Sequence, residues 1–390
     1  MACSIGWAPF PAMIRPHYPR EADASAHTGP LPAGVGIPSG VQPLAHLGAV
    51  VDSMRSEWGG RRPLILTHRT PDPDALGAMF GLDLLLRRAF GLEPEIAAAG
   101  RIARAENVAM LRELELAFTD AEHLDSSRYG GVFLVDTQPG FGHTTLPDGI
   151  PVVAVFDHHR PPDVEALRER PMPPHYDLRL EVGATSALMY GYLRDAEIEI
   201  DSRTATALCC GVRFDTLDLA ISATELDSEA FFETFRRADH QKLARIQRPT
   251  LPAVYYRDLY RSLSRARRYG PAVLGFLGRV SHPESVAEMA DFFRRMEQCR
   301  WSLVGGAVGA TYHLSLRTDG NEAYPFLQHV LGADGSFGGR GTVAGGQVQL
   351  ASDDWRELQR LERRLRNRAL ELIDPAERTG ARGVRLTQIP

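Results

Sequence analysis

The sequence predicts an α/β protein with a doubly wound, mainly parallel sheet domain, joined by a helical connector to a smaller α/β C-terminal domain. Two observations predict the first domain. Short apolar segments alternate with helical segments between residues 60 and 215, which is typical of βαβ units and a parallel sheet. The run VVAVF at 152–156 indicates a strand that is buried on both faces. The length of 390 residues is sufficient for two domains.

The first 40 residues are rich in Pro, Gly and Ala without sustained periodicity, which predicts a mobile tail. Residues 41–223 are expected to form the first domain. Its first helix is expected at residues 41–57, and its second at residues 75–90, where Gly91 is expected to end it. The remaining expected helices are 105–116, 183–196 and 202–212, and the expected strands are 63–67, 95–99, 131–135 and 151–156.

The helical connector is expected at residues 224–269, which are charged and are interrupted by Pro249 and Pro252. The second domain would span 270–374, followed by a tail at 375–390. Its expected strands are 272–277, 301–310, 312–317 and 347–350, and its expected helices are 283–296, 323–331 and 355–373. The glycine-dense segment GADGSFGGRGTVAGG at 332–346 predicts a loop.

Composition limits the classes of function. The net charge of -5 argues against a large basic surface for duplex DNA, although a few arginines could still hold a small anion. The four cysteines include no CxxC pair, which suits a reducing cytoplasm. We find neither a secretory signal nor an apolar run near the ~20 residues that cross a bilayer. We therefore expect a cytoplasmic protein without a membrane partner.

Acidic and histidine side chains follow several of the predicted strands. The segments that carry them are HRTPDPDALG, FLVDT, FDHH and GVRFDT. Since the carboxyl ends of parallel strands share one edge of a sheet, we expect these side chains to meet there. Oxygen and imidazole donors without thiolates favour manganese or magnesium. Each segment alone also has a plainer interpretation, as a turn, a loop cap or a solvated helix end.

In order and spacing, the four segments resemble the motifs of the DHH phosphoesterase superfamily over about residues 60–220. The resemblance implies two bound manganese ions, with magnesium as an alternative, and a bridging carboxylate from Asp136. It implies catalytic roles for Asp136, for His159, which would face the scissile phosphate, and for Asp157, which would orient a histidine. The implied metal ligands are His68, Asp72, Asp74, Asp136, His158 and Asp215.

The segments HLSLRT and GGRGTVAGG resemble the DHH-associated C-terminal domain of the nanoRNase branch. The relatives usually carry His after the Gly-Gly pair, where this chain has Arg340. Arginine can pair with phosphate but cannot act as a neutral acceptor, and a plain surface turn is the alternative for the glycines. Members of the pyrophosphatase branch usually have a different anion site. The glycine-dense segment therefore argues against that branch. The implied substrate-binding residues are His159, Arg317, Gly338, Gly339 and Arg340.

We therefore expect a manganese-dependent phosphoesterase that hydrolyses short nucleotides, namely nanoRNA or 5′-phosphorylated dinucleotides, with a water activated by two metal ions. The expected partner is a short single-stranded oligonucleotide or small nucleotide, and a homodimer is left open. Two alternatives remain, a 3′-phosphoadenosine 5′-phosphate phosphatase and a non-catalytic nucleotide sensor.

Overall fold

The structure is a computed structural model that describes residues 36–38, 40–100, 102–161, 172–320, 322–352, 354–373 and 382–389, with the backbone alone at Arg340. Most of the predicted tails, 1–40 and 375–390, therefore lies outside the described residues. The chain divides into two compact units. Among the described residues, the first unit ends at Leu251 and the second begins at Pro252.

A six-stranded parallel sheet forms the centre of the first unit, in the order β3-β2-β1-β4-β5-β6. The predicted fold class is thus confirmed for this unit. The strand order reverses direction between β1 and β4, and such a switch point is where doubly wound sheets place their ligands. The strands are β1 (Arg62–Leu66), β2 (Glu95–Ala98), β3 (Thr119–Asp120), β4 (Tyr129–Val135), β5 (Val152–Asp157) and β6 (His175–Leu178).

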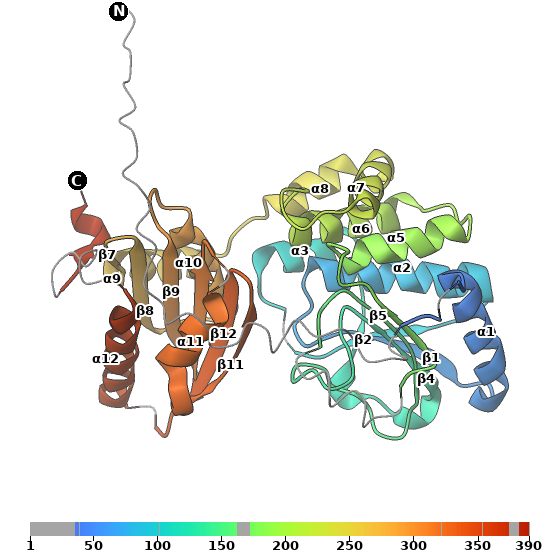
Figure 1. The fold of residues 1–390 in the computed structure, drawn as a ribbon, viewed down its shortest axis with the longest axis horizontal. Coiled ribbons are helices and arrows are strands. Elements are labelled where there is room, and N and C mark those ends of the chain that lie inside the picture. Colours follow the sequence, from blue (N-terminus) through green and yellow to red (C-terminus); the bar gives the residue numbers. More distant parts are fainter. Residues whose placement is uncertain are drawn as a thin grey trace, which may run out of the picture. The chain divides into compact units, whose positions relative to one another are not determined.

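Helices cover one face of this sheet, where α2, α5 and α6 lie side by side (Figure 1). Their apolar side chains pack with Phe133 and Phe156 of the sheet. The opposite face, with Leu134 and Val155, packs against Leu146 and other side chains of the connecting segments. The helices of this unit are α1 (Pro43–Arg55), α2 (Pro73–Phe90), α3 (Ala105–Glu113), α5 (Thr185–Asp195), α6 (Ser202–Thr216), α7 (Glu225–Arg237) and α8 (His240–Gln247), and its short 3-10 helices are Ser56–Trp58, Ala121–His123 and Ser126–Arg128.

The start of α2 is defined by its sequence. Oδ1 of Asp72 accepts hydrogen bonds from the backbone N–H groups of Asp74 and Ala75, both at 3.0 Å. Pro73 occupies the first helical position, where its missing N–H costs nothing. The helix ends at Gly91, whose φ of 59° is left-handed. The cap holds Asp72 and Asp74 at the edge of the sheet that carries the predicted site.

The second unit contains a seven-stranded sheet in the order β11-β12-β10-β9-β8-β7-β13. Only β8 and β9 pair in parallel; the other described pairs are antiparallel. One face packs against α9 and α10, and the other against α11 and α12. The elements are α9 (Ala253–Arg265), β7 (Arg267–Tyr269), β8 (Ala272–Arg279), α10 (Glu284–Arg294), β9 (Trp301–Val308), β10 (Thr311–Thr318), α11 (Ala323–Leu331), β11 (Ser336–Arg340), β12 (Val343–Gln349), α12 (Trp355–Leu372) and β13 (Val384–Arg385), with short 3-10 helices at Gly332–Asp334 and Leu386–Gln388.

Residues 224–269, expected to form a connector, are shared between the two units. Helix α7 packs against α5 and α6, and α8 packs against α3. Helix α9 packs against β8 of the second unit. The division between the units falls at Leu251 and Pro252, where proline restricts the backbone of the residue that precedes it.

The glycine-dense segment at 332–346 is largely a β-hairpin, so the prediction of a loop is wrong there. Strands β11 and β12 are antiparallel partners and turn at Gly341, whose φ is 56°. A Cβ atom on Gly339 would lie 2.5 Å from the Cα atom of Ala344, so glycine allows the two strands to approach. The sequence suggested flexibility, whereas these glycines permit close pairing.

Within the described part of the chain, every helix is too short or too polar to cross a membrane.

Candidate metal centre

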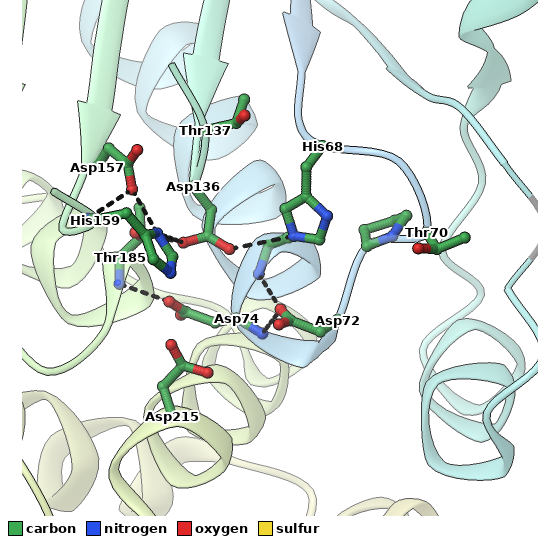
Figure 2. A network of polar contacts seen from close by, with 12 residues as sticks. His68, Thr70, Asp72, Asp74, Asp136, Thr137, Asp157, His159, Thr185 and Asp215 are labelled. Atoms are coloured by element: carbon green, nitrogen blue, oxygen red, sulfur yellow. Dashed lines mark hydrogen bonds and ion pairs between the residues drawn. The ribbon is translucent and has the colours of Figure 1, made fainter. Parts of the chain in front are cut away.

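Polar side chains gather at the carboxyl ends of β1, β4 and β5, around the switch point of the parallel sheet (Figure 2). His68 lies two residues beyond β1, Asp136 follows β4 directly, and Asp157 is the last residue of β5. Asp72 and Asp74 join them from the start of α2, and Asp215 joins them from the last turn of α6. With His158, which directly follows Asp157, the six predicted metal ligands therefore come together in the first unit.

Asp136 lies at the centre of this cluster. Its Oδ2 atom is 3.5 Å from Nε2 of His68, and its Oδ1 atom is 3.7 Å from Nε2 of His158. Oδ1 also accepts a hydrogen bond of 2.9 Å from the Thr185 hydroxyl. The backbone N–H donates to the carbonyl of Phe156 at 2.9 Å, and φ is 56°. This left-handed conformation, which costs an ordinary residue energy, turns the carboxylate between histidines from two different strands.

The donors divide into three overlapping groups, in each of which the candidate ligand atoms lie within 4.8 Å of one another. Asp136 belongs to two of the groups, and so does His158. The groups are His68, Asp72 and Asp136; Asp74, His158 and Asp215; and Asp136, His158 and His159. Two neighbouring cation positions that share Asp136 are compatible with this arrangement.

The hydrogen bonds of two histidines fix the atoms that face the cluster. Nδ1 of His68 donates to the Arg69 carbonyl at 2.9 Å, and Nδ1 of His158 donates to the Val182 carbonyl at 3.1 Å. In the neutral imidazole, Nε2 is then an acceptor. Nε2 of His158 is buried, makes no hydrogen bond to the described residues, and lies 3.3 Å from a carboxylate oxygen of Asp215. Because two acceptors face each other there, the residues fit a bound cation.

The concentration of negative charge shifts the proton affinities of the cluster. Burial, together with repulsion from Asp215 and Asp136, raises the pKa of Asp72 to about 6. Burial and repulsion from Asp136 raise the pKa of Asp74 well above its usual value. Burial lowers the pKa of His68, but its contact with Asp136 and the charge of Asp72 outweigh this effect and raise it to about 9. A divalent cation would offset this charge.

Helix α5 supplies backbone groups to the cluster. The buried carboxylate of Asp74 accepts hydrogen bonds from the N–H groups of Thr185 at 2.7 Å and Ser186 at 2.8 Å, at the first turn of α5. A helix N-terminus favours a carboxylate because its N–H groups have no partner within the helix. Asp74 is thereby held in one orientation.

Asp157 is buried and orients the neighbouring His159. Its Oδ1 atom accepts hydrogen bonds from Nδ1 of His159 at 2.9 Å and from the N–H groups of His158 and His159 at 2.7 and 3.1 Å. The imidazole of His159 is 41 % exposed, the most exposed among the histidines of this cluster. Because Nδ1 is bonded to Asp157, Nε2 is the ring nitrogen of His159 that could contact a substrate.

Several residues of the site were missed from the sequence. Thr185 contacts Asp136, and Gln138 donates to the carbonyl of His159 at 2.6 Å while accepting from the hydroxyl of Tyr176. His143, for which we found no meaningful spacing, has its carbonyl bonded to the N–H of Arg69 and its ring 5.4 Å from that of His68. These residues carry no motif, and only the packing brings them to the cluster.

The residues of the second unit that were predicted to bind substrate are described by their contacts within that unit. Arg317 lies in β10 and forms an ion pair with Asp291 of α10, while also donating to the hydroxyl of Ser315 at 2.8 Å. Gly338 and Gly339 lie within β11. The side chain of Arg340 is outside the described part of the structure. Their roles in substrate binding stay predictions.

Comparison with known proteins finds curated relatives, and two of them match this chain over different lengths. An uncharacterized protein of Methanocaldococcus jannaschii is 31% identical over 317 residues, which are 80% of this chain and 64% of that protein. A "Probable manganese-dependent inorganic pyrophosphatase" of Streptococcus pyogenes is 27% identical over 175 residues, 44% of this chain and 53% of that protein. The chain thus spans less than two thirds of either relative. No family model matches it.

Among solved structures, an exopolyphosphatase-related protein from Bacteroides fragilis aligns with a TM-score of 0.64 and 14% identity. The alignment covers 84% of this chain and 97% of that protein. Because the alignment extends over most of the chain, it supports the predicted α/β architecture as a whole. The chain thus shares the fold of that exopolyphosphatase-related protein.

Proposed function

We propose that this protein is a metal-dependent phosphoesterase that hydrolyses short nucleotides such as nanoRNA or 5′-phosphorylated dinucleotides. The observation that carries the proposal is the pair of donor groups that meet at Asp136, one with His68 and the other beside His158. Buried carboxylates and the unsatisfied Nε2 atom of His158 lie together at one sheet edge. Such a set contributes little to stability, whereas hydrolysis with two metal ions needs it.

Manganese suits the donors, which are carboxylate oxygens and imidazole nitrogens, and magnesium is the alternative. One ion would be held by His68, Asp72 and Asp136, and the other by Asp74, His158, Asp215 and Asp136. When bound, the ions would lower the pKa of a water molecule and neutralise charge on the phosphoryl oxygens. The printed name of the streptococcal relative, which mentions manganese, agrees with this choice.

The protein's own side chains would orient the substrate. His159, held by Asp157 at 2.9 Å and partly exposed, would place Nε2 against a phosphoryl oxygen and donate a hydrogen bond as charge develops. Asp136, fixed by Thr185, would keep the two cation positions together. We propose Arg317, Gly338, Gly339 and Arg340 as contacts to the distal part of the substrate.

A panel of substrates tests the proposal. Purified full-length protein with added manganese is given a 5′-phosphorylated dinucleotide, longer RNA and DNA, 3′-phosphoadenosine 5′-phosphate and pyrophosphate. We expect the highest kcat/KM for the dinucleotide. Pyrophosphate is included because a relative over 175 residues carries the name of a pyrophosphatase. Preference for the adenosine bisphosphate or pyrophosphate would replace the proposed substrate, and binding without turnover would favour a nucleotide sensor.

A further inference from the structure

We propose that Phe141 and His143 form a stacking platform for the nucleobase next to the scissile phosphate. Both residues belong to the β4–β5 loop, residues 136–151, which begins with Asp136. The inference rests on the proposed function and narrows it, because a base-stacking subsite selects nucleotides over pyrophosphate and polyphosphate. Neither residue belongs to the groups of candidate metal ligands.

The rings of His143 and Phe141 each contact a different histidine of the metal cluster. His68 and His159 lie on opposite sides of Asp136 (Figure 2). The ring of His143 is 5.4 Å from that of His68, and the ring of Phe141 is 6.5 Å from that of His159, each in an edge-to-face arrangement. Phe141 and His143 also contact each other at 5.3 Å. A group attached to a phosphate at the cluster would therefore be within reach of the pair.

Hydrogen bonds hold the platform in place. The carbonyl of His143 accepts from the N–H of Arg69 at 2.8 Å, and the carbonyl of Phe141 accepts from the N–H of Thr144 at 3.0 Å. The hydroxyl groups of Thr137 and Thr144 are also bonded to each other across the loop. Since the loop is tied to itself and to the segment after β1, the rings are positioned before a substrate arrives, which reduces the entropic cost of binding.

The exposure of the pair indicates a ligand with a flat apolar face. Phe141 is only partly buried and His143 is exposed, so both rings retain surface that a planar group can cover. Bases stack on aromatic side chains with about 1–3 kcal/mol each, and an imidazole can also bond to a base edge. A pyrophosphate has no such face and would gain nothing from these rings.

The plainer interpretation is that the rings only cover His68 and His159 and keep them in place. The two interpretations differ in their dependence on the base. A covering role would affect every phosphate ligand to the same extent, because it acts through the metal ligands. A platform would affect only ligands that carry a base.

The test compares adenosine 5′-monophosphate with ribose 5-phosphate, which lacks the base. Affinities for full-length protein with added manganese are measured by calorimetry for wild type, Phe141→Ala, Phe141→Tyr and His143→Ala. Phe232→Ala is the matched control, because Phe232 is an exposed phenylalanine on α7. Manganese stoichiometry is measured for each variant.

We expect wild type to bind adenosine 5′-monophosphate about 5- to 150-fold more tightly than ribose 5-phosphate. Phe141→Ala should remove most of this preference and His143→Ala should reduce it, while the ribose 5-phosphate affinity and the manganese stoichiometry stay unchanged. Phe141→Tyr and Phe232→Ala should keep the preference.

Equal weakening of both ligands, an unchanged preference in Phe141→Ala, or a wild type without preference would each overturn the platform. Failure of the proposed function is a separate result. Base-selective binding that depends on Phe141, without hydrolysis of any phosphoester, would support the platform and contradict the enzyme.

Discussion

Asp136 belongs to two of the three groups of candidate ligands, and its two carboxylate oxygens face His68 and His158 respectively. Asp136→Asn keeps the shape and the oxygen that accepts from Thr185 but removes the negative charge. Because the repulsion between two cations would then be less offset, we predict that turnover falls by several orders of magnitude and that at least one manganese ion binds more weakly. Activity assays and calorimetric manganese titration measure both effects.

Asp120→Asn is the matched control, since Asp120 is an exposed carboxylate of the same unit. It should leave both measurements unchanged. Near-normal turnover of Asp136→Asn with two bound ions would refute the bridging role.

The proton affinity of His68 predicts how manganese binding depends on pH. Contact with Asp136 outweighs burial and raises the pKa of His68 to about 9 in the metal-free protein. A cation must therefore displace a proton from this imidazole at neutral pH. We predict that manganese affinity rises between pH 6.5 and pH 8.5, by about tenfold per pH unit for each proton released. Affinity that is constant over this range would show that the imidazole is not a ligand.

The raised pKa of His68 also predicts how the stability of the metal-free protein depends on pH. The pKa of His68 is raised in the folded state, to about 9 from 6.5, so the folded state binds this proton more tightly than the unfolded state. The resulting stabilisation is complete below pH 6.5 and is lost as the pH rises through 9. Thermal unfolding with a chelator should therefore show a Tm that falls over this range in wild type, and falls less in His68→Asn.

At the scale of elements, close packing of α5 and α6 positions the ligands. A Cβ atom on Gly211 of α6 would lie 2.1 Å from the hydroxyl oxygen of Ser186 and 2.9 Å from a carboxylate oxygen of Asp74. Gly211→Ala should force the helices apart, at a cost of about 1–3 kcal/mol, and should weaken manganese binding. Denaturant unfolding and metal titration test this.

Gly191→Ala provides the control within α5. Its Cβ atom would meet only Leu226, at 3.5 Å, and alanine is the better helix former by about 1 kcal/mol. This variant should be as stable as wild type or more stable, with normal manganese binding. Equal destabilisation of both variants would mean that the packing at Gly211 has no special role.

The parts of the fold that could be predicted are those with strong local patterns. The apolar run of β5 and the acidic and histidine residues after it indicate both the strand and the site at its end. Strand β6 was missed because its four residues include the polar His175 and Asp177, whose burial depends on the network with Tyr192. The hairpin of β11 and β12 was missed because local sequence does not show whether glycines serve flexibility or close approach.

The same contrast holds within the candidate site. His68, Asp136 and His158 follow strands and could be expected at the sheet edge from the sequence, whereas Asp215 lies in the last turn of α6. Phe141, His143 and Thr185 could not be expected there, because their position depends on hydrogen bonds and ring contacts between distant segments.

At the scale of the whole molecule, the proposed metal ligands all lie in the first unit, which has apolar cores of its own. The proposed distal contacts, including Arg317, lie in the second unit. We predict that a chain ending at Leu251 still binds manganese but loses most dinucleotide hydrolysis, because it lacks those contacts. Full dinucleotide activity of this fragment would exclude the second unit from the site.

The central claim is that the cluster around Asp136 makes this protein a metal-dependent phosphoesterase. The most direct measurement is the initial rate of hydrolysis of a 5′-phosphorylated dinucleotide by the full chain, first after complete removal of divalent metal and then during manganese titration. We predict no hydrolysis without metal, and a rate that rises with manganese and saturates when the sites on each chain are filled. Hydrolysis that persists without metal, or a chain that binds manganese stoichiometrically yet hydrolyses no phosphoester, would contradict the claim.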